Sequence, residues 1–378
     1  MSHLSSRREL LAAGLSLPLL ASTAAASPAR RRDGEGKRLL VLGGTRFLGP
    51  AVVDEALERG YEVTLFNRGK SNPGLYSELE TLIGDRDTHE LSALEGRQWD
   101  VVVDTSCYLP SHATAAGQLL ADNVDRYVMI SSLSVYAEPG GKDIDESAPV
   151  GEISDEDSAK VTRIGDVYRV AGGAYYGPLK ARCEAELEAL MPGRVTNLRP
   201  GVIAGREDPS DRLPYWVIRV EQGGEILAPG RPDLEVHFTD VRDLGIFSLD
   251  FAEKGLGGVY NANGFAGPVT FQELLHGCKA VMGSDCSFTW MDGDWLLEQQ
   301  VRPFSEMPFW LPDAYAPRWD NAKGVAAGMR FRPIAETIRE TADWFHEVRD
   351  AQYKWGVYGM QPERERELLA KWRAREDE

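Results

Sequence analysis

Two segments of the chain contain the side chains best suited to chemistry. Tyr176 and Lys180 stand four residues apart in residues 175–184, which open like a helix. On a helix this spacing places the phenol and the ammonium one turn apart on one face. The cation can then stabilise the phenolate and lower a tyrosine pKa that is ordinarily about 10, so the tyrosine acts as acid or base near neutral pH. Ser132, within the serine-rich residues 131–134, offers a hydroxyl that can hold a reacting oxygen while a hydride moves to or from a nicotinamide.

A glycine-rich segment near the start of the chain predicts where such a cofactor would bind. Residues 37–42 read KRLLVL and form a short, mainly apolar run, residues 43–49 read GGTRFLG, and apolar residues at helical spacing follow as far as Gly60. This order predicts a strand, a glycine turn and a helix, with a second strand at 61–67. Glycines let the backbone approach a pyrophosphate, whose charge the free amides and the helix dipole receive. The candidate cofactor contacts are therefore Gly43, Gly44, Thr45, Arg46, Phe47, Leu48 and Gly49.

The residues after the second strand bear on which dinucleotide binds. NAD-binding proteins usually place an acid there for the ribose hydroxyls, whereas this chain has Asn67-Arg68-Gly69-Lys70. A guanidinium can instead bind an adenosine 2'-phosphate, so Asn67 and Arg68 favour NADP over NAD, with Arg46 as a second candidate cation. The alternative for Arg68 and Lys70 is a solvated loop.

Three further apolar segments, at 81–85, 100–104 and 126–130, predict additional strands. Their centres lack polar alternation, which is typical of a parallel sheet covered on both faces, and the segments between them are long enough for crossover helices. The predicted fold is therefore α/β, a Rossmann-type doubly wound parallel sheet. Asp85, at the end of the third strand, either contacts an adenine or caps a turn.

Taken in order, GGTRFLG, Ser132, Tyr176 and Lys180 resemble the short-chain dehydrogenase/reductase superfamily, specifically its extended, NAD-dependent epimerase/dehydratase branch, over most of residues 37–345. The segments 196–205, 238–244 and 259–262 are similar to later parts of that branch's sheet. The resemblance implies that Tyr176 is the catalytic acid/base, that Lys180 binds the nicotinamide ribose and tunes Tyr176, and that Ser132 orients the substrate.

One departure from that pattern introduces a second class of function. Arg46 stands where extended members usually have glycine, and the GTRFLG form is similar to an atypical clade that includes chloroplast stem-loop-binding proteins, some of which act on RNA. An RNA-binding or catalytically inactive relative is the resulting alternative. With 59 acidic and 42 basic residues, a net charge of -17 disfavours nucleic acid as a partner. The retained Tyr176 and Lys180 also favour an enzyme.

The length fits two globular units, or one large unit with a smaller lobe. From the motifs and the resemblance we expect a dinucleotide-binding domain at 37–205, to whose sheet residues 236–262 return, and a smaller substrate lobe at 206–235 and 264–345. Aromatic and charged residues in the lobe suit a polyhydroxylated, sugar-like ligand, with Arg212 and Tyr215 as weak candidate contacts; the alternative for the aromatic residues is the lobe's own core. A C-terminal helical extension at 346–378 is expected to pack on the body of the protein or on a partner subunit of a homodimer.

The first residues predict a targeting signal rather than part of the folded domain. Arg7-Arg8 precedes a soft apolar stretch that closes at Ala24-Ala25-Ala26, which resembles a twin-arginine signal peptide over residues 1–26, followed by a flexible leader at 27–36. A periplasmic or extracellular location follows, or a cytoplasmic one if these residues are only a disordered start. The stretch is too short and interrupted for a stable membrane span.

Cysteine and histidine spacing predicts no metal site. The four cysteines lack CxxC spacing and the six histidines form no HxxxH or HExxH pattern, while pairing of Cys278 with Cys286 stays open. The sequence as a whole predicts an exported, NADP-binding enzyme that oxidises and reduces a sugar-like carbonyl or secondary alcohol. It leaves epimerase, dehydratase and reductase undecided. Because no nicotinamide pool is expected outside the cytoplasm, a cofactor that stays bound and is regenerated in place favours epimerisation or two coupled half-reactions.

Overall fold

A computed structural model describes residues 34–137, 144–265, 267–312, 318–348 and 358–376. These residues belong to one compact unit. The predicted signal peptide at 1–26 and most of the predicted leader at 27–36 lie outside the described residues. The export prediction is therefore carried by the sequence alone.

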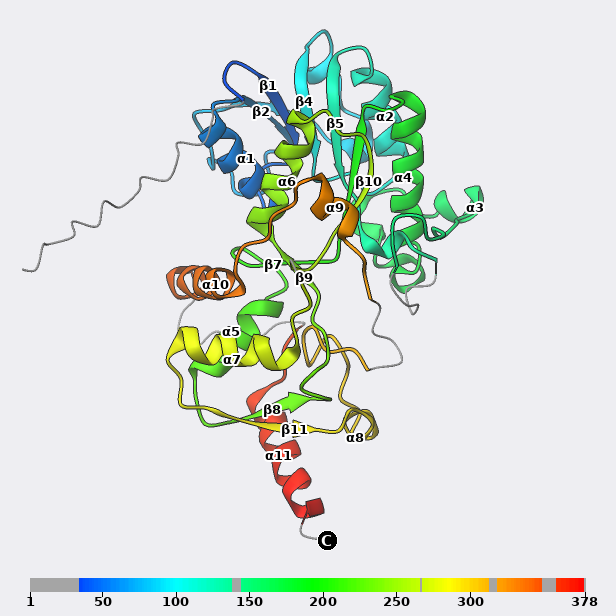
Figure 1. The fold of residues 1–378 in the computed structure, drawn as a ribbon. Helices are drawn as coiled ribbons and strands as arrows, with labels where there is room; N and C mark the ends of the chain where they lie inside the picture. Colours follow the sequence, from blue (N-terminus) through cyan, green and yellow to red (C-terminus); the bar gives the residue numbers. More distant parts are fainter. Residues whose placement is uncertain (1–33, 138–143, 266, 313–317, 349–357, 377–378) are drawn as a thin grey trace, which may run out of the picture. The chain divides into compact units, whose positions relative to one another are not determined.

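The main sheet contains seven parallel strands in the order β10-β6-β5-β4-β1-β2-β3 (Figure 1). This confirms the predicted α/β, doubly wound parallel sheet, and each predicted strand of this sheet lies within two residues of its expected bounds. The strands are β1 (Arg38–Leu42), β2 (Glu62–Asn67), β3 (Glu80–Ile83), β4 (Trp99–Asp104), β5 (Val124–Ile130), β6 (Val195–Pro200) and β10 (Gly258–Ala262).

Helices cover both faces of this sheet because alternate residues of its strands face opposite cores. In β1, Leu39 and Val41 join one core and Leu40 and Leu42 join the other, and all four side chains are buried. Burial on both faces explains why the strand is apolar without alternation. Two helices cover each face (Figure 1): α1 (Leu48–Arg59) and α6 (Val241–Glu253) on the first, α2 (Pro110–Leu120) and α4 (Tyr176–Leu190) on the second.

The order of the strands reverses between β1 and β4. From β1 the chain continues to β2 and β3 on one side, and from β4 it continues to β5 and β6 on the other. Connections that leave in opposite directions open a crevice at the carboxyl ends of these two strands, the usual ligand position in open α/β sheets. Gly43 and Gly44 follow β1 and Thr105 and Ser106 follow β4, so these residues border the crevice.

The predicted return of residues 236–262 to the main sheet is only partly right. The strand β10 pairs with β6 in that sheet, but β9 (Phe238–Asp240) pairs with β7 (Val202–Ala204) in a separate two-stranded sheet. The chain leaves the main sheet after Pro200, which has no amide hydrogen to donate to a ladder. The adjoining Gly201 lets Asn263 approach closely, since an added Cβ would lie 2.1 Å from the Asn263 Oδ1.

A second apolar core gathers residues from the C-terminal half and includes the buried Trp216, Trp295 and Trp310. This matches the alternative that the tryptophans form the core of a smaller lobe. The parallel strands β8 (Glu225–Pro229) and β11 (Ser287–Met291) belong to the same half. The helices that contribute to this second core are α5 (Arg212–Glu221), α7 (Phe271–Met282), α8 (Gly293–Glu298), α10 (Ile334–Val348) and α11 (Pro362–Glu376). The helix α9 (Ala322–Ala327) packs near β10 of the main sheet instead.

The C-terminal helix α11 packs on the body of the protein, one of the two predicted arrangements. Leu368 and Leu369 are buried in the second core. The Glu365 carboxylate accepts a hydrogen bond from Arg219 at 2.7 Å and one from the Leu227 amide at 3.0 Å. The predicted boundary at residue 346 is wrong, because α10 continues through it to Val348.

Two properties of the described residues bear on function. No helix among them is long and apolar enough to cross a bilayer. Nor do they contain a group of three or more histidine, cysteine, aspartate or glutamate residues arranged to hold a metal ion. Cys278 and Cys286, whose pairing the sequence left open, are both buried free thiols, and burial raises the pKa of Cys278. Such a thiol is unreactive.

Candidate active site

A cavity of about 410 Å³ lies at the carboxyl ends of β1 and β4. The glycine turn forms one wall, and Tyr176 and Lys180 of α4 line the same cavity. Gly49 and Ser132 are not part of the lining, but each follows a lining residue in the chain, Leu48 and Ser131 respectively. The structure thus brings together the two segments that the sequence analysis singled out. The predicted site residues that line the cavity are Gly43, Gly44, Thr45, Arg46, Phe47, Leu48, Asn67, Arg68, Asp85, Tyr176 and Lys180.

The glycine turn has the geometry of a phosphate-binding turn. Gly43 and Gly44 have φ angles of 119° and 94°, which favour glycine. Gly49 is needed for packing, because an added Cβ would lie 2.5 Å from the Gly44 carbonyl carbon. No side chain caps the start of α1, where Phe47 and Leu48 line the cavity. The uncapped helix start and its dipole suit a pyrophosphate.

The polar groups of the cavity lining also suit a bound dinucleotide. Three buried polar atoms of lining residues, Asn67 Nδ2, Arg86 Nε and Ser131 Oγ, have no hydrogen-bond partner in the described part of the chain. Buried polar atoms without partners are uncommon and indicate an unmade contact. The lining also contains five cationic side chains against one acid, Asp85, although the chain as a whole carries -17. The cations are Arg46, Arg68, Lys70, Arg86 and Lys180.

Tyr176 begins α4, and Lys180 lies one turn further along the same helix. The Lys180 ammonium is buried, donates to the Ile130 carbonyl at 2.7 Å and lies 4.6 Å above the Tyr108 ring. The Ser132 hydroxyl, which accepts from the Ser134 amide at 3.1 Å, is within hydrogen-bonding reach of the Tyr176 phenol. One phenol, one ammonium and one serine hydroxyl therefore meet at the cavity.

The predicted lowering of the Tyr176 pKa is wrong for this structure. Burial of the phenol disfavours its charged form, nearby Tyr108 adds to that effect, and together they raise the pKa of Tyr176 to about 12. Hydrogen bonds with Ser132 and Tyr168 offset only part of the rise. The Lys180 ammonium is instead directed to the Ile130 carbonyl.

Asp85 has the capping role that the sequence analysis left as one of two alternatives. Its carboxylate accepts from the Asp87 amide at 3.1 Å at the start of the 3₁₀ helix η1 (Arg86–Thr88). It also lines the cavity, so an adenine contact remains compatible with the geometry. The two roles are not exclusive.

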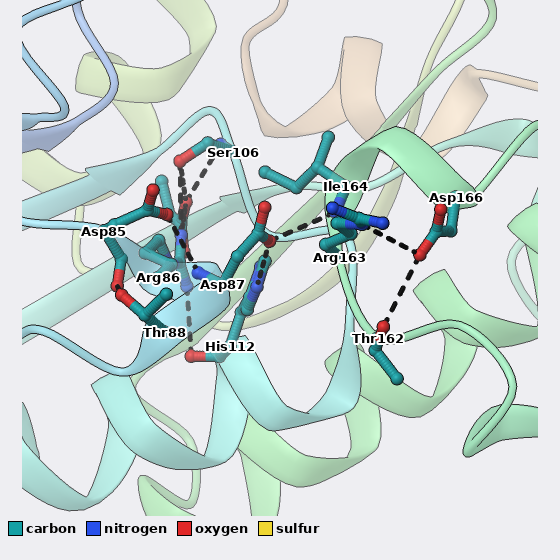
Figure 2. Close-up of polar contacts among 11 residues, drawn as sticks. Asp85, Arg86, Asp87, Thr88, Ser106, His112, Thr162, Arg163, Ile164 and Asp166 are labelled. Atoms are coloured by element: carbon teal, nitrogen blue, oxygen red, sulfur yellow. Dashed lines mark hydrogen bonds and ion pairs between the residues drawn. The ribbon is translucent and has the colours of Figure 1, made fainter.

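Sequence reasoning missed a polar cluster around Arg86, a buried residue of the cavity lining; Figure 2 shows Arg86 with Ser106 and His112. Arg86 pairs with Asp104 at 2.6 Å and donates to the Ser106 hydroxyl and the His112 carbonyl at 3.2 and 3.0 Å. Tyr127 donates to the other Asp104 oxygen at 2.6 Å. Asp104 directly follows three buried valines in β4, and a carboxylate at such a position was the signal that could have revealed the cluster.

The two weak substrate candidates do not line this cavity. Tyr215 is packed in the second apolar core against Trp216, at 1% exposure, where a sugar-like ligand does not reach it. Arg212 donates to the Ser210 hydroxyl at 2.5 Å and stacks near Phe304 at 5.9 Å. Tyr215 therefore belongs to the core, as the alternative for the aromatic residues had it, while a substrate contact by Arg212 stays a prediction.

Comparison with protein families identifies the chain's relatives. The model described as "NAD dependent epimerase/dehydratase family" matches residues 39–262. The chain belongs to this family. The matched range begins in β1, contains the glycine turn, Tyr176 and Lys180, and ends with β10. Membership supports a nicotinamide dinucleotide as the cofactor class.

One curated relative is a chloroplast protein. The chain is 31% identical over 115 residues to the chloroplast stem-loop binding protein of 41 kDa b of Arabidopsis thaliana. The match covers 26% of this chain and 30% of that protein, so it spans less than a third of the relative.

Solved structures of family enzymes share the fold at low sequence identity. The UDP-glucose 4-epimerase of Thermotoga maritima, solved with UDP-glucose, is 17% identical, with a TM-score of 0.58 over 82% of this chain and 99% of that one. The UDP-N-acetylglucosamine 4-epimerase of Methanobrevibacter ruminantium M1 is 16% identical, with a TM-score of 0.61 over 83% and 100%. These likenesses show the fold.

Proposed function

We propose that the chain is an NADP-using epimerase or oxidoreductase that moves a hydride to and from a carbon of a sugar-like alcohol or carbonyl. One observation carries the proposal: Tyr176 and Lys180 line the same cavity as the glycine turn, with the Ser132 hydroxyl beside the phenol. A side-chain acid/base next to a dinucleotide turn is the arrangement that hydride transfer requires.

The roles of the residues follow from their positions. The nicotinamide, when bound, accepts a hydride from the substrate carbon and can return it. Ser132 holds the substrate oxygen, and the Tyr176 oxygen takes the hydroxyl proton during oxidation and gives it back during reduction. Lys180, fixed by the Ile130 carbonyl, holds the nicotinamide ribose. The glycine turn binds the pyrophosphate, and Asp85 borders the adenine end.

The raised pKa of Tyr176 predicts how the reaction depends on pH. Oxidation of the alcohol needs the phenolate, whose fraction grows as the pH rises toward the pKa of about 12. We expect the oxidation rate to rise about tenfold per pH unit between about pH 7 and 10, while carbonyl reduction, which uses the protonated phenol, stays flat. Single-turnover rates with bound cofactor measure both. An oxidation rate that is level across this range would contradict the proposed role of Tyr176.

The choice of NADP rests on the cations near the end of β2. Arg68, Lys70 and the exposed Arg46 line the cavity, where a guanidinium can bind the 2'-phosphate. We expect Arg68→Ala to weaken NADP binding about tenfold while NAD binding changes little, since one charged hydrogen bond is lost. Calorimetric titration with each cofactor measures this. Arg97→Ala, which removes an exposed arginine outside the cavity lining, is the matched control; an unchanged preference in Arg68→Ala would refute the assignment.

The sugar-like substrate is supported by the enzymes that share the fold. Two of them are sugar-nucleotide epimerases, one solved with UDP-glucose. We carry that substrate class over as a proposal and test it with UDP-sugars and free sugars, scoring transfer of a deuterium label from the substrate carbon. Absence of label exchange with every sugar would limit the proposal to another secondary alcohol.

We also propose that the protein is exported with its cofactor bound. A protein that leaves the cytoplasm through a twin-arginine signal would take its cofactor along, so the cofactor should remain bound in the mature protein. Native mass spectrometry of the full chain would show the added mass of NADP, and the same spectrum would show whether a homodimer forms. A protein purified from the periplasm without a bound cofactor would contradict the retention argument.

The alternative of RNA binding is favoured by one observation, the match to a chloroplast stem-loop binding protein. Its test is retention of a stem-loop RNA that weakens steeply with salt. RNA retention together with unchanged behaviour of Tyr176→Phe would favour that alternative over the enzyme.

A further inference from the structure

Part of residues 144–175, which precede Tyr176, packs beside the candidate active site. These residues include α3 (Asp155–Ser158) and the 3₁₀ helices η4 (Ile164–Asp166) and η5 (Val170–Gly173). We refer to residues 161–170 as the cap segment. Its Val161 and Val167 are buried and pack with Leu109 and with Leu179 of α4. The cap segment is thus held to the helix that carries Tyr176.

The carboxylate of Asp87, which follows the lining residues Asp85 and Arg86 in the chain, bonds the middle of the cap segment (Figure 2). The Asp87 Oδ1 accepts from the Ile164 amide at 3.1 Å, and the same oxygen lies 3.1 Å from the His112 Nε2. Ile164 itself lines the cavity. Burial and the adjacent Arg86 lower the pKa of His112 to about 4, so the ring is neutral near pH 7.

The same segment places a second phenol against Tyr176. The ring centroids of Tyr168 and Tyr176 lie 5.1 Å apart at an angle of 34°, and Tyr168 is 63% exposed. Just before Tyr168, the Asp166 carboxylate accepts from Thr162 at 3.4 Å and from Arg163 at 3.3 Å (Figure 2). It also pairs with Arg169. These contacts of Asp166 hold the turn from which the Tyr168 ring reaches Tyr176.

We propose that Tyr168 is a positioning residue for the acid/base step: its hydroxyl donates a hydrogen bond to the Tyr176 oxygen, stabilises the phenolate, and is held in place by the bond between Asp87 and Ile164. The inference rests on the proposed function of Tyr176 and adds a residue to it. No spacing pattern in the sequence pointed to Tyr168.

The surroundings of Tyr176 leave little else to stabilise its charge. The titratable groups near the phenol are Tyr108, Tyr168, Lys180 and Cys183, with the Ser132 hydroxyl beside them. Tyr108 raises the pKa of Tyr176, whereas hydrogen bonds with Ser132 and Tyr168 lower it. Removing the Tyr168 hydroxyl therefore raises the pKa of Tyr176 and reduces the phenolate present at a given pH.

The first test is Tyr168→Phe, which keeps the ring and removes the hydroxyl. We expect the oxidation rate at about pH 8 to fall about tenfold and the whole pH profile to move about one unit toward higher pH, with the affinity for NADP unchanged. Damage to the fold alone would slow carbonyl reduction as much as oxidation, whereas loss of phenolate stabilisation slows oxidation and leaves reduction, which uses the protonated phenol, nearly unchanged. A profile that does not move overturns the proposal while leaving Tyr176 in its role, whereas a wild-type protein without hydride transfer defeats both.

The second test addresses the hydrogen bond between Ile164 and Asp87, and its first readout, hydrogen exchange, needs no cofactor. Asp87→Ala should remove the protection of the Ile164 amide in hydrogen exchange and move the pH profile in the same direction as Tyr168→Phe. Asp87→Asn retains an acceptor oxygen and should restore the protection. Asp145→Ala, which removes an exposed carboxylate that bonds only Ser147 among its described partners, should change neither measurement. Unchanged exchange at residues 161–170 in Asp87→Ala overturns the role given to the bond between Asp87 and Ile164.

Discussion

Replacing Tyr176 by phenylalanine is expected to slow hydride transfer by about 10²- to 10⁴-fold, the usual contribution of a positioned general acid or base. The ring keeps its place at the start of α4 and its contact with Tyr168, while the oxygen that takes the proton is lost. Single-turnover transfer of a deuteride to the bound cofactor measures the loss.

Tyr175→Phe is the matched control for this experiment. It removes a neighbouring phenol that donates to Asp157 at 2.9 Å and does not line the cavity. Its rate should stay within about threefold of the parent, the range of a small surface change. Cofactor affinity should be unchanged in both variants. A Tyr176→Phe protein that transfers hydride at the parental rate would rule out the acid/base assignment.

Replacing Arg86 by methionine is expected to lower the free energy of unfolding by about 3–5 kcal/mol, because Asp104 would remain as a buried charge without its cation. Both side chains are almost completely buried, at 7% and 0% exposure. Burial opposes the charge of Asp104, yet Arg86, helped by hydrogen bonds from Tyr127 and the Ser106 amide, holds the pKa of Asp104 below its ordinary value. Denaturant unfolding near neutral pH measures the loss.

The sign of the pH dependence distinguishes this charge effect from simple loss of packing. A lowered native pKa stabilises the fold above the ordinary aspartate pKa of about 4, and that stability disappears as the pH falls through the native value. The difference between parent and Arg86→Met should therefore shrink in acid. Adding Asp104→Asn to the variant removes the buried charge and should recover more than half of the loss. Equal losses at all pH values in both variants would contradict the mechanism.

The central sheet was predictable because its strands are buried on both faces. Such strands are apolar without interruption, and Leu39 to Leu42 show why, since alternate side chains enter opposite cores. The glycine turn was equally predictable. Gly43 and Gly44 have positive φ angles, and Gly49 has no room for a Cβ, so few other residue types fit these positions. The meeting of Tyr176 with this turn followed from the motif order.

What the sequence did not reveal depends on contacts between distant segments. Tyr168 comes from short 3₁₀ turns without periodicity, and its neighbour Tyr176 is known only once the chain has folded. The predicted direction of the Tyr176 pKa shift was wrong for the same reason, since burial of the phenol outweighs the hydrogen bonds that stabilise its charged form. Arg212 and Tyr215 were assigned by residue type, which does not separate a ligand contact from a core contact.

The attachment of α11 has a consequence for how the protein is made. Leu368 and Leu369 complete an apolar core whose other members begin at Ala204, and Glu365 bonds the Leu227 amide within it. A ribosome that has synthesised only the first 360 or so residues has therefore produced a core with one side open to water. That half of the molecule finishes folding only after the segment has left the exit tunnel, and any earlier stop in translation would yield a product prone to aggregation.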